Sequence, residues 1–151
     1  MSDQLVVFAT PAFDGNVTLG FQTSLIRTLK LCTEKGIRWE VANIAHDPYL
    51  AKVRNAIVSG CLASVPEMTD FFFLDADLEW DAAGAIKLIE SNRDVVAGIY
   101  PKKNDVPDFP CELVFEGYDM VDGKPKGGSL VEDNGWYKAR KVPTGFLRIK
   151  R

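Results

Sequence analysis

The sequence predicts an α/β fold, specifically a three-layer α/β/α sandwich with a mainly parallel, Rossmann-like central sheet. Short β-prone runs alternate with helical patterns over the first two-thirds of the chain. The run Phe71–Leu74 is apolar throughout, as expected of a strand covered on both faces. The 151 residues, 46% of them hydrophobic and 26% charged, suit one globular domain with a sizeable core.

The first two helices follow from apolar spacing and from capping residues. Apolar residues recur at three- and four-residue intervals from Phe21 to Cys32, including Leu25 and Leu29, and Gly36 is suited to close this helix. Asp47-Pro48 supplies a cap and a first helical residue for the next one. In chain order we expect a strand at 4–10, a helix at 18–35, a strand at 37–45 and a helix from 48.

The remaining elements complete the sandwich and then change character. After the strand at 71–74, Asp81 can cap a short helix, and residues 94–100 read as a fourth strand. A late β-hairpin region follows, with Asp122-Gly123 as a two-residue turn and late strands at 112–115, 138–142 and 146–149. We expect a single domain over 1–151, truncated at its C-terminus because the sequence stops within its last strand.

Composition disfavours several classes of function. The net charge of −3 lacks the basic excess of a dedicated nucleic-acid binder, so no nucleic-acid partner is expected. No segment resembles a signal peptide or is long and apolar enough to span a bilayer, which favours a cytoplasmic location. The widely spaced Cys32, Cys61 and Cys111 indicate reduced thiols rather than a disulfide framework.

Asp75-Ala76-Asp77 is the strongest functional signal in the chain. It directly follows the buried strand, at the edge where α/β sheets bind ligands. If the backbone stays extended, the two carboxylates point the same way, and a hard divalent cation such as Mn²⁺ or Mg²⁺ relieves their repulsion. The competing interpretation is a pair of solvated residues at the end of a strand.

In this context the chain resembles the nucleotide-diphospho-sugar transferases, the GT-A class of glycosyltransferases, and is especially similar to viral, phage and metagenomic members. The resemblance extends over nearly the whole chain and depends on the order of individually loose pieces. These are Val7–Pro11, Lys52–Val58, Phe72–Leu78, Asp94–Lys103 and Pro143–Leu147.

The resemblance implies a metal-dependent, hexosyltransferase-like enzyme that transfers a sugar from a nucleotide-diphosphate donor to a glycan or protein acceptor. It assigns Mn²⁺ or Mg²⁺ to Asp75 and Asp77, with Asp77 favoured as the direct ligand. Three assigned residues keep a second interpretation: Phe13 as core packing, Asp47 as a helix cap and Arg54 as a surface salt bridge. The residues assigned to the nucleotide sugar are Thr10, Pro11, Ala12, Phe13, Asp47, Arg54, Asp75 and Ala76.

The chain departs from the family pattern at two points. His46 is the sole histidine and lies too early to be the additional metal ligand of many members. The acidic pair Glu132-Asp133 precedes the last strand, whereas a catalytic base is expected after it, so no catalytic base is assigned. The sequence leaves open the donor sugar, the nucleotide base, the acceptor and the stereochemistry. It also leaves open whether an exposed sheet edge pairs with a second copy to form a homodimer.

Three other functions compete with this one. A haloacid-dehalogenase-like phosphohydrolase would use Asp75 as nucleophile and Asp77 as acid/base, but its motif normally follows the first strand. A sugar nucleotidyltransferase would need a glycine-rich phosphate loop, and residues 11–15 contain one glycine. The third alternative is a non-catalytic remnant that binds nucleotide sugars.

Overall fold

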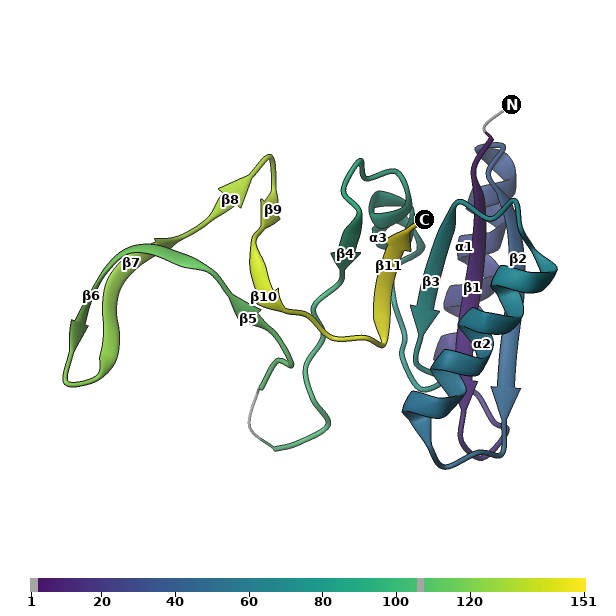
Figure 1. The fold of residues 1–151 in the computed structure, drawn as a ribbon, viewed down its shortest axis with the longest axis horizontal. Helices are drawn as coiled ribbons and strands as arrows, with labels where there is room; N and C mark the ends of the chain where they lie inside the picture. Colours follow the sequence, from purple (N-terminus) through teal and green to yellow (C-terminus); the bar gives the residue numbers. More distant parts are fainter. Residues whose placement is uncertain (1–2, 106–107) are drawn as a thin grey trace. The chain divides into compact units, whose positions relative to one another are not determined.

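The chain divides into two compact units in the computed structural model, which describes residues 3–105 and 108–151 (Figure 1). Unit 1 consists of Met1–Gly98 and Thr144–Arg151, and unit 2 consists of Ile99–Pro143. None of the helices in the described ranges combines the length and apolar content needed to cross a membrane.

Unit 1 is built on a five-stranded sheet with the order β2-β1-β3-β11-β4. β1 pairs in parallel with β2 and with β3, whereas β11 is antiparallel to both of its neighbours, β3 and β4. The α/β class is confirmed, and the sheet is mixed, because the returning strand β11 runs against the common direction of the other four strands. The strands are β1 (Leu5–Ala12), β2 (Arg38–Ala45), β3 (Asp70–Leu74), β4 (Val95–Ala97) and β11 (Phe146–Lys150).

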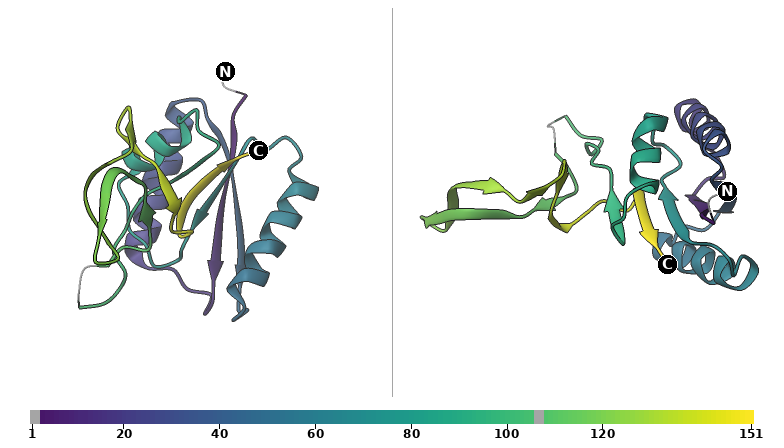
Figure 2. Two further views of the ribbon diagram at one scale, coloured as in Figure 1. Left: turned by 60° about the vertical axis from the view of Figure 1, so that its left-hand side comes forward. Right: turned by 90° about the horizontal axis from the view of Figure 1, so that it is seen from above.

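Helices cover both faces of this sheet and give three layers (Figure 2). α1 (Leu19–Glu34) and α3 (Ala82–Ile89) lie on one face, and α2 (Leu50–Ser64) lies on the other. Alternate residues of β1 and β3 point to opposite faces, so both strands are buried along their whole length. The α2 face carries a hydrophobic cluster that includes Val7, Val53, Ile57, Phe73 and Leu147.

α1 ends where the sequence predicts but buries a different stripe. Gly36 has a φ of +71°, and the Ile37 and Gly36 amides donate to the Cys32 and Thr33 carbonyls, which is a Schellman closure. Cys32 is buried as expected. Leu25 and Leu29 are only partly buried, whereas Ser24 and Thr28, which both bond to Trp80, are buried.

Of three further predicted element boundaries, one is confirmed and two differ from the structure. α3 begins as predicted, because Asp81 accepts a hydrogen bond from the Ala83 amide. α2 begins at Leu50 with Tyr49 as its cap residue, so the predicted Asp47-Pro48 start is wrong. β4 covers Val95–Ala97, which is shorter than the expected strand over 94–100.

Unit 2 contains only paired β-strands among its described residues. Asp122 and Gly123 both have positive φ, 51° and 73°, as the predicted two-residue turn between β6 and β7 requires. The three pairs are β5 (Glu112–Leu113) with β10 (Ala139–Lys141), β6 (Phe115–Val121) with β7 (Lys124–Leu130), and β8 (Glu132–Asp133) with β9 (Trp136–Tyr137).

A buried ion pair joins β3 to β11. The Arg148 guanidinium contacts the Asp70 carboxylate, and both side chains are 2% exposed. Gln4 and Thr69 donate further hydrogen bonds to Asp70, and Arg148 donates to the Arg93 carbonyl. Because Gln4, Arg93 and Arg148 come from segments distant from Asp70, the pair fixes the register of β11 in the sheet.

We predict that Arg148→Met destabilises the protein by about 3–5 kcal/mol, because it leaves the Asp70 carboxylate buried without its cation. Combining it with Asp70→Leu should restore much of the loss, since neither charge then remains buried. Urea unfolding measures both effects. The control is Lys35→Met, which breaks an exposed pair with Glu90 at 2.8 Å and should cost at most about 1 kcal/mol. An Arg148→Met cost no larger than the control would refute the prediction.

Candidate functional site

The carboxyl ends of β1, β2 and β3 meet at one edge of the sheet. These three strands are parallel, and the last residue of β1, Ala12, lies opposite the last residue of β2, Ala45. The loops that follow cover residues 13–18, 46–49 and 75–81. This is the edge where ligands bind in open α/β sheets.

The first predicted contact segment divides into a buried and an exposed part. Thr10, Pro11 and Ala12 are buried within β1, which runs two residues further than predicted. Phe13 leaves the strand, and its side chain is 69% exposed. The core-packing interpretation of Phe13 is therefore wrong, and its ring is available at the sheet edge.

The loops after β1 and β2 touch each other. The His46 amide donates to the Ala12 carbonyl at 3.2 Å. A Cβ atom on Gly15, whose φ is +79°, would lie 2.5 Å from the His46 ring. Gly15 is therefore required both by backbone conformation and by the close approach of the imidazole. In the same loop, the Asn16 amide donates to Asp14 and lowers the pKa of its carboxyl group.

Asp75, Ala76 and Asp77 form a turn rather than an extension of β3. The Leu78 amide donates to the Asp75 carbonyl at 3.1 Å, and the strand ends at Leu74. The expectation that alternation on an extended backbone aligns the two carboxylates is therefore wrong. Both aspartates nevertheless belong to the one turn that follows β3, at the carboxyl edge of the sheet.

Arg54 reaches this turn from α2. Its Nη2 lies 2.7 Å from Asp75 Oδ1, with the two side chains 17% and 32% exposed. The guanidinium carbon also lies 5.7 Å from the centre of the Phe73 ring. The Nε of Arg54 is buried and has no hydrogen-bond partner among the described residues. The fold brings together Arg54 and Asp75, which are 21 positions apart, as a partly buried salt bridge.

Asp47 is already occupied by neighbours on its own loop. One carboxylate oxygen accepts from the Tyr49 amide at 2.9 Å, and the other pairs with Lys52 at 2.7 Å. These contacts, led by that with Lys52, hold the pKa of Asp47 below its usual range. Asp47 therefore closes a turn before α2 instead of capping the helix.

The described residues offer two carboxylates for a cation and not a complete cage. Within the described ranges, no group of three or more histidine, cysteine, aspartate or glutamate side chains converges. A cation on Asp75 and Asp77 would complete its shell with water and ligand phosphate oxygens. Mg²⁺ bound between one or two carboxylates and a substrate diphosphate is coordinated in this way, so two carboxylates supply enough protein donors for a cation shared with a ligand.

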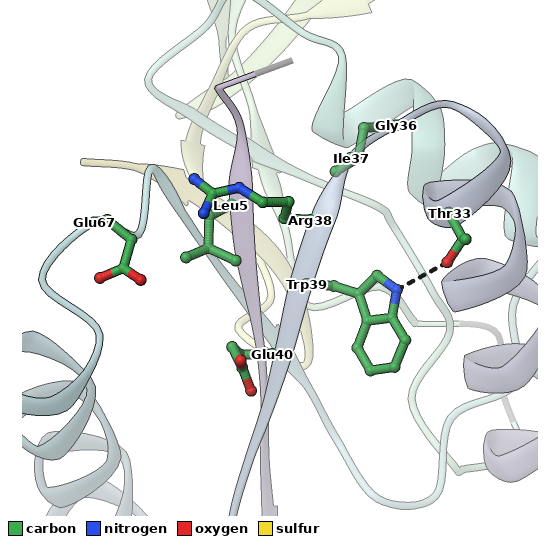
Figure 3. Close-up of a pocket in the computed structure, with 8 residues that line it drawn as sticks. All are labelled: Leu5, Thr33, Gly36, Ile37, Arg38, Trp39, Glu40 and Glu67. Carbon is green, nitrogen blue, oxygen red and sulfur yellow. Dashed lines mark hydrogen bonds between the residues drawn. The ribbon is translucent and has the colours of Figure 1, made fainter. Parts of the chain in front are cut away.

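A shallow hollow lies at the opposite end of the sheet (Figure 3). It is bounded by Leu5 at the start of β1, by the first residues of β2 and by Glu67 before β3. Trp39 bonds to Thr33 on the α1 side, whereas the side chains of Arg38, Glu40 and Glu67 lie on the other side of β2 from the Trp39 ring. These polar groups do not converge, so the hollow is no rival to the carboxyl edge as a binding site.

Sequence reasoning missed the residues that fix the Asp75 turn. The Thr18 amide donates to the Ala76 carbonyl, and the Asp75 amide donates to the Gly145 carbonyl. Ser24 and Thr28 bond to Trp80, which follows the turn. The i, i+4 spacing of two hydroxyl residues in an otherwise apolar stripe was the available signal.

Comparisons with known proteins supply no relative: no family model, no curated protein and no solved structure matches the chain.

We predict that Lys52→Ala raises the pKa of Asp47 toward its ordinary value, although the Tyr49 amide still lowers it. Because the folded-state pKa of Asp47 is depressed, its small stabilising effect is present above the unfolded pKa and is lost as the pH falls through the folded value. Carboxyl-carbon NMR titration measures the shift. Lys30→Ala, which breaks the remote pair with Glu34, should leave Asp47 unchanged. An unchanged Asp47 pKa in Lys52→Ala would contradict the assigned cause.

Proposed function

We propose that the chain is a metal-dependent glycosyltransferase that binds a nucleotide-diphosphate sugar at the carboxyl edge of its sheet. The observation that carries this proposal is the Asp75–Asp77 turn, which directly follows β3 and is linked to α2 by Arg54. Mn²⁺ or Mg²⁺ on this turn would bridge to the donor diphosphate and offset the charge that develops as the diphosphate departs.

The two aspartates are given different proposed roles. Arg54 pairs with Asp75, and this ion pair helps to orient the Asp75 carboxylate. We assign Asp77 as the main cation ligand and Asp75 as the second, with Ala76 supplying backbone between them. The Arg54 guanidinium suits phosphate oxygens and adds positive charge beside the cation.

The loop after β1 supports the nucleoside part of this proposal. Thr10, Pro11 and Ala12 are buried at the end of β1, and the exposed ring of Phe13 offers a flat apolar surface on which a base can stack. Asp47 is a weaker candidate, because Lys52 and the Tyr49 amide already engage its carboxylate. The acceptor remains a glycan or protein of unassigned structure, and no catalytic base is assigned.

The test is a thermal-shift titration with UDP- and GDP-sugars, with and without Mn²⁺. We expect a nucleotide sugar to raise the melting temperature only when Mn²⁺ is present, because a ligand that binds the native state stabilises it. Asp77→Asn should abolish this metal-dependent shift. Asp119→Asn, the same change of charge on an exposed residue of the β6–β7 hairpin, is the matched control and should retain it.

Other outcomes would count against the proposal in distinguishable ways. Metal-dependent stabilisation that persists in Asp77→Asn would remove the assigned cation site. Release of phosphate from simple phosphoesters would favour the haloacid-dehalogenase-like hydrolase. Binding of a nucleotide sugar without transfer to any of a panel of acceptors would favour the non-catalytic remnant.

A further inference from the structure

We propose that Trp80, held by Ser24 and Thr28 of α1, is the positioning residue for the Asp75–Asp77 turn; this inference rests on the function proposed above. Trp80 lies three residues after Asp77 and immediately before Asp81, the cap of α3. It is therefore placed to fix the end of the segment that carries both carboxylates.

Trp80 is bound through both its backbone and its side chain. Its amide donates to Ser24 Oγ at 3.1 Å, and its indole Nε1 donates to Thr28 Oγ1 at 2.9 Å. Thr28 Oγ1 in turn donates to the Ser24 carbonyl at 2.8 Å, so the threonine hydroxyl both accepts and donates a hydrogen bond. The two hydroxyls lie one helical turn apart and act on a single residue.

The cost of burying these hydroxyls indicates a specific role. Ser24 is 3% exposed and Thr28 is 0% exposed, on a helix face where apolar side chains would pack without hydrogen-bond constraints. A fully satisfied buried polar network rigidifies the structure and selects one geometry. The indole ring of Trp80 packs against Phe21 and Phe146, and this apolar packing does not itself need the hydrogen bonds to Ser24 and Thr28.

The rest of the segment is tied to the same helix. The Thr18 amide, at the cap of α1, donates to the Ala76 carbonyl at 3.1 Å. Glu79 packs against Gly20 in the first turn of α1, where an added Cβ would lie 2.7 Å from the carboxylate. α1 and its cap residue Thr18 therefore hold the segment that carries the turn at two points, Ala76 and Trp80, which lie on either side of Asp77.

The helix offers a chemically matched control. Thr33 Oγ1 also accepts from an indole, that of Trp39, at 3.1 Å, and donates to the Leu29 carbonyl at 3.0 Å. The Thr33–Trp39 pair lies beside the amino end of β2, away from the Asp75 turn. Thr28→Val and Thr33→Val thus remove the same type of hydrogen bond from the same helix, one beside the turn and one distant from it.

The first readout is amide hydrogen exchange in the ligand-free protein. In Thr28→Val we expect the Leu78 and Thr18 amides to exchange about tenfold faster than in the wild type, while the amides of β1 stay protected. Thr33→Val should leave the Leu78 and Thr18 amides unchanged. Thr28→Ser keeps the hydroxyl and should restore their protection. Uniform loss of protection, or no loss at Leu78, would overturn the inference.

The second readout is the dissociation constant for Mn²⁺ with UDP and, separately, with GDP, measured by calorimetry. We expect it to rise about tenfold in Thr28→Val and by less than twofold in Thr33→Val. If the wild type binds and Thr28→Val binds with the same dissociation constant, the positioning role is overturned. A wild-type protein that binds neither probe would overturn the proposed function, and hydrogen exchange would still decide whether Trp80 positions the turn.

Discussion

The arrangement of unit 1 depends on the insertion of β11 between β3 and β4. β11 pairs with β3 from Phe146 opposite Leu74 to Lys150 opposite Asp70. Near one end, the buried pair between Arg148 and Asp70 fixes this register. At the other end, the Gly145 carbonyl accepts the Asp75 amide, so the strand that completes the sheet also determines where the Asp75 turn begins.

The turn is consequently held by elements on both faces of the sheet. β11 binds its first residue, α1 binds Ala76 and Trp80, and Arg54 of α2 pairs with the Asp75 carboxylate. Rigid supports of this kind hold a binding constellation more precisely than a free loop does. These supports are the structural argument for the binding role proposed above for the two aspartates.

The sequence predicted the features that depend on near neighbours. Gly36 closes α1, Asp81 caps α3 and Asp122-Gly123 forms a hairpin turn, because each geometry is set within a few residues. The direction of β11 was not predictable in this way, since strand pairing depends on residues far apart in the chain. The start of α2 was misread because Asp47 forms a turn with Tyr49 that resembles a cap in sequence.

The same limit applies to the candidate site. The Asp75-Ala76-Asp77 triplet and its place after a buried strand could be read directly, whereas the sequence left open whether Phe13 is exposed or packed in the core. The link between Arg54 and Asp75 depends on how α2 packs on the sheet, and the role of Thr28 depends on which face of α1 is buried. In the sequence, Thr28 is a polar residue within a mostly apolar helical pattern. In the structure, its hydroxyl is buried and hydrogen-bonds to Trp80 and to the Ser24 carbonyl.

The discontinuity of unit 1 has a consequence for its biosynthesis. All of unit 2 is translated between β4 and β11, so β3 emerges long before its second neighbour exists. In the nascent chain Asp70 is a carboxylate without its arginine, and sealing it into a core at that stage is unfavourable. Completion of the sheet therefore requires β11, which carries Arg148 and is translated after all of unit 2.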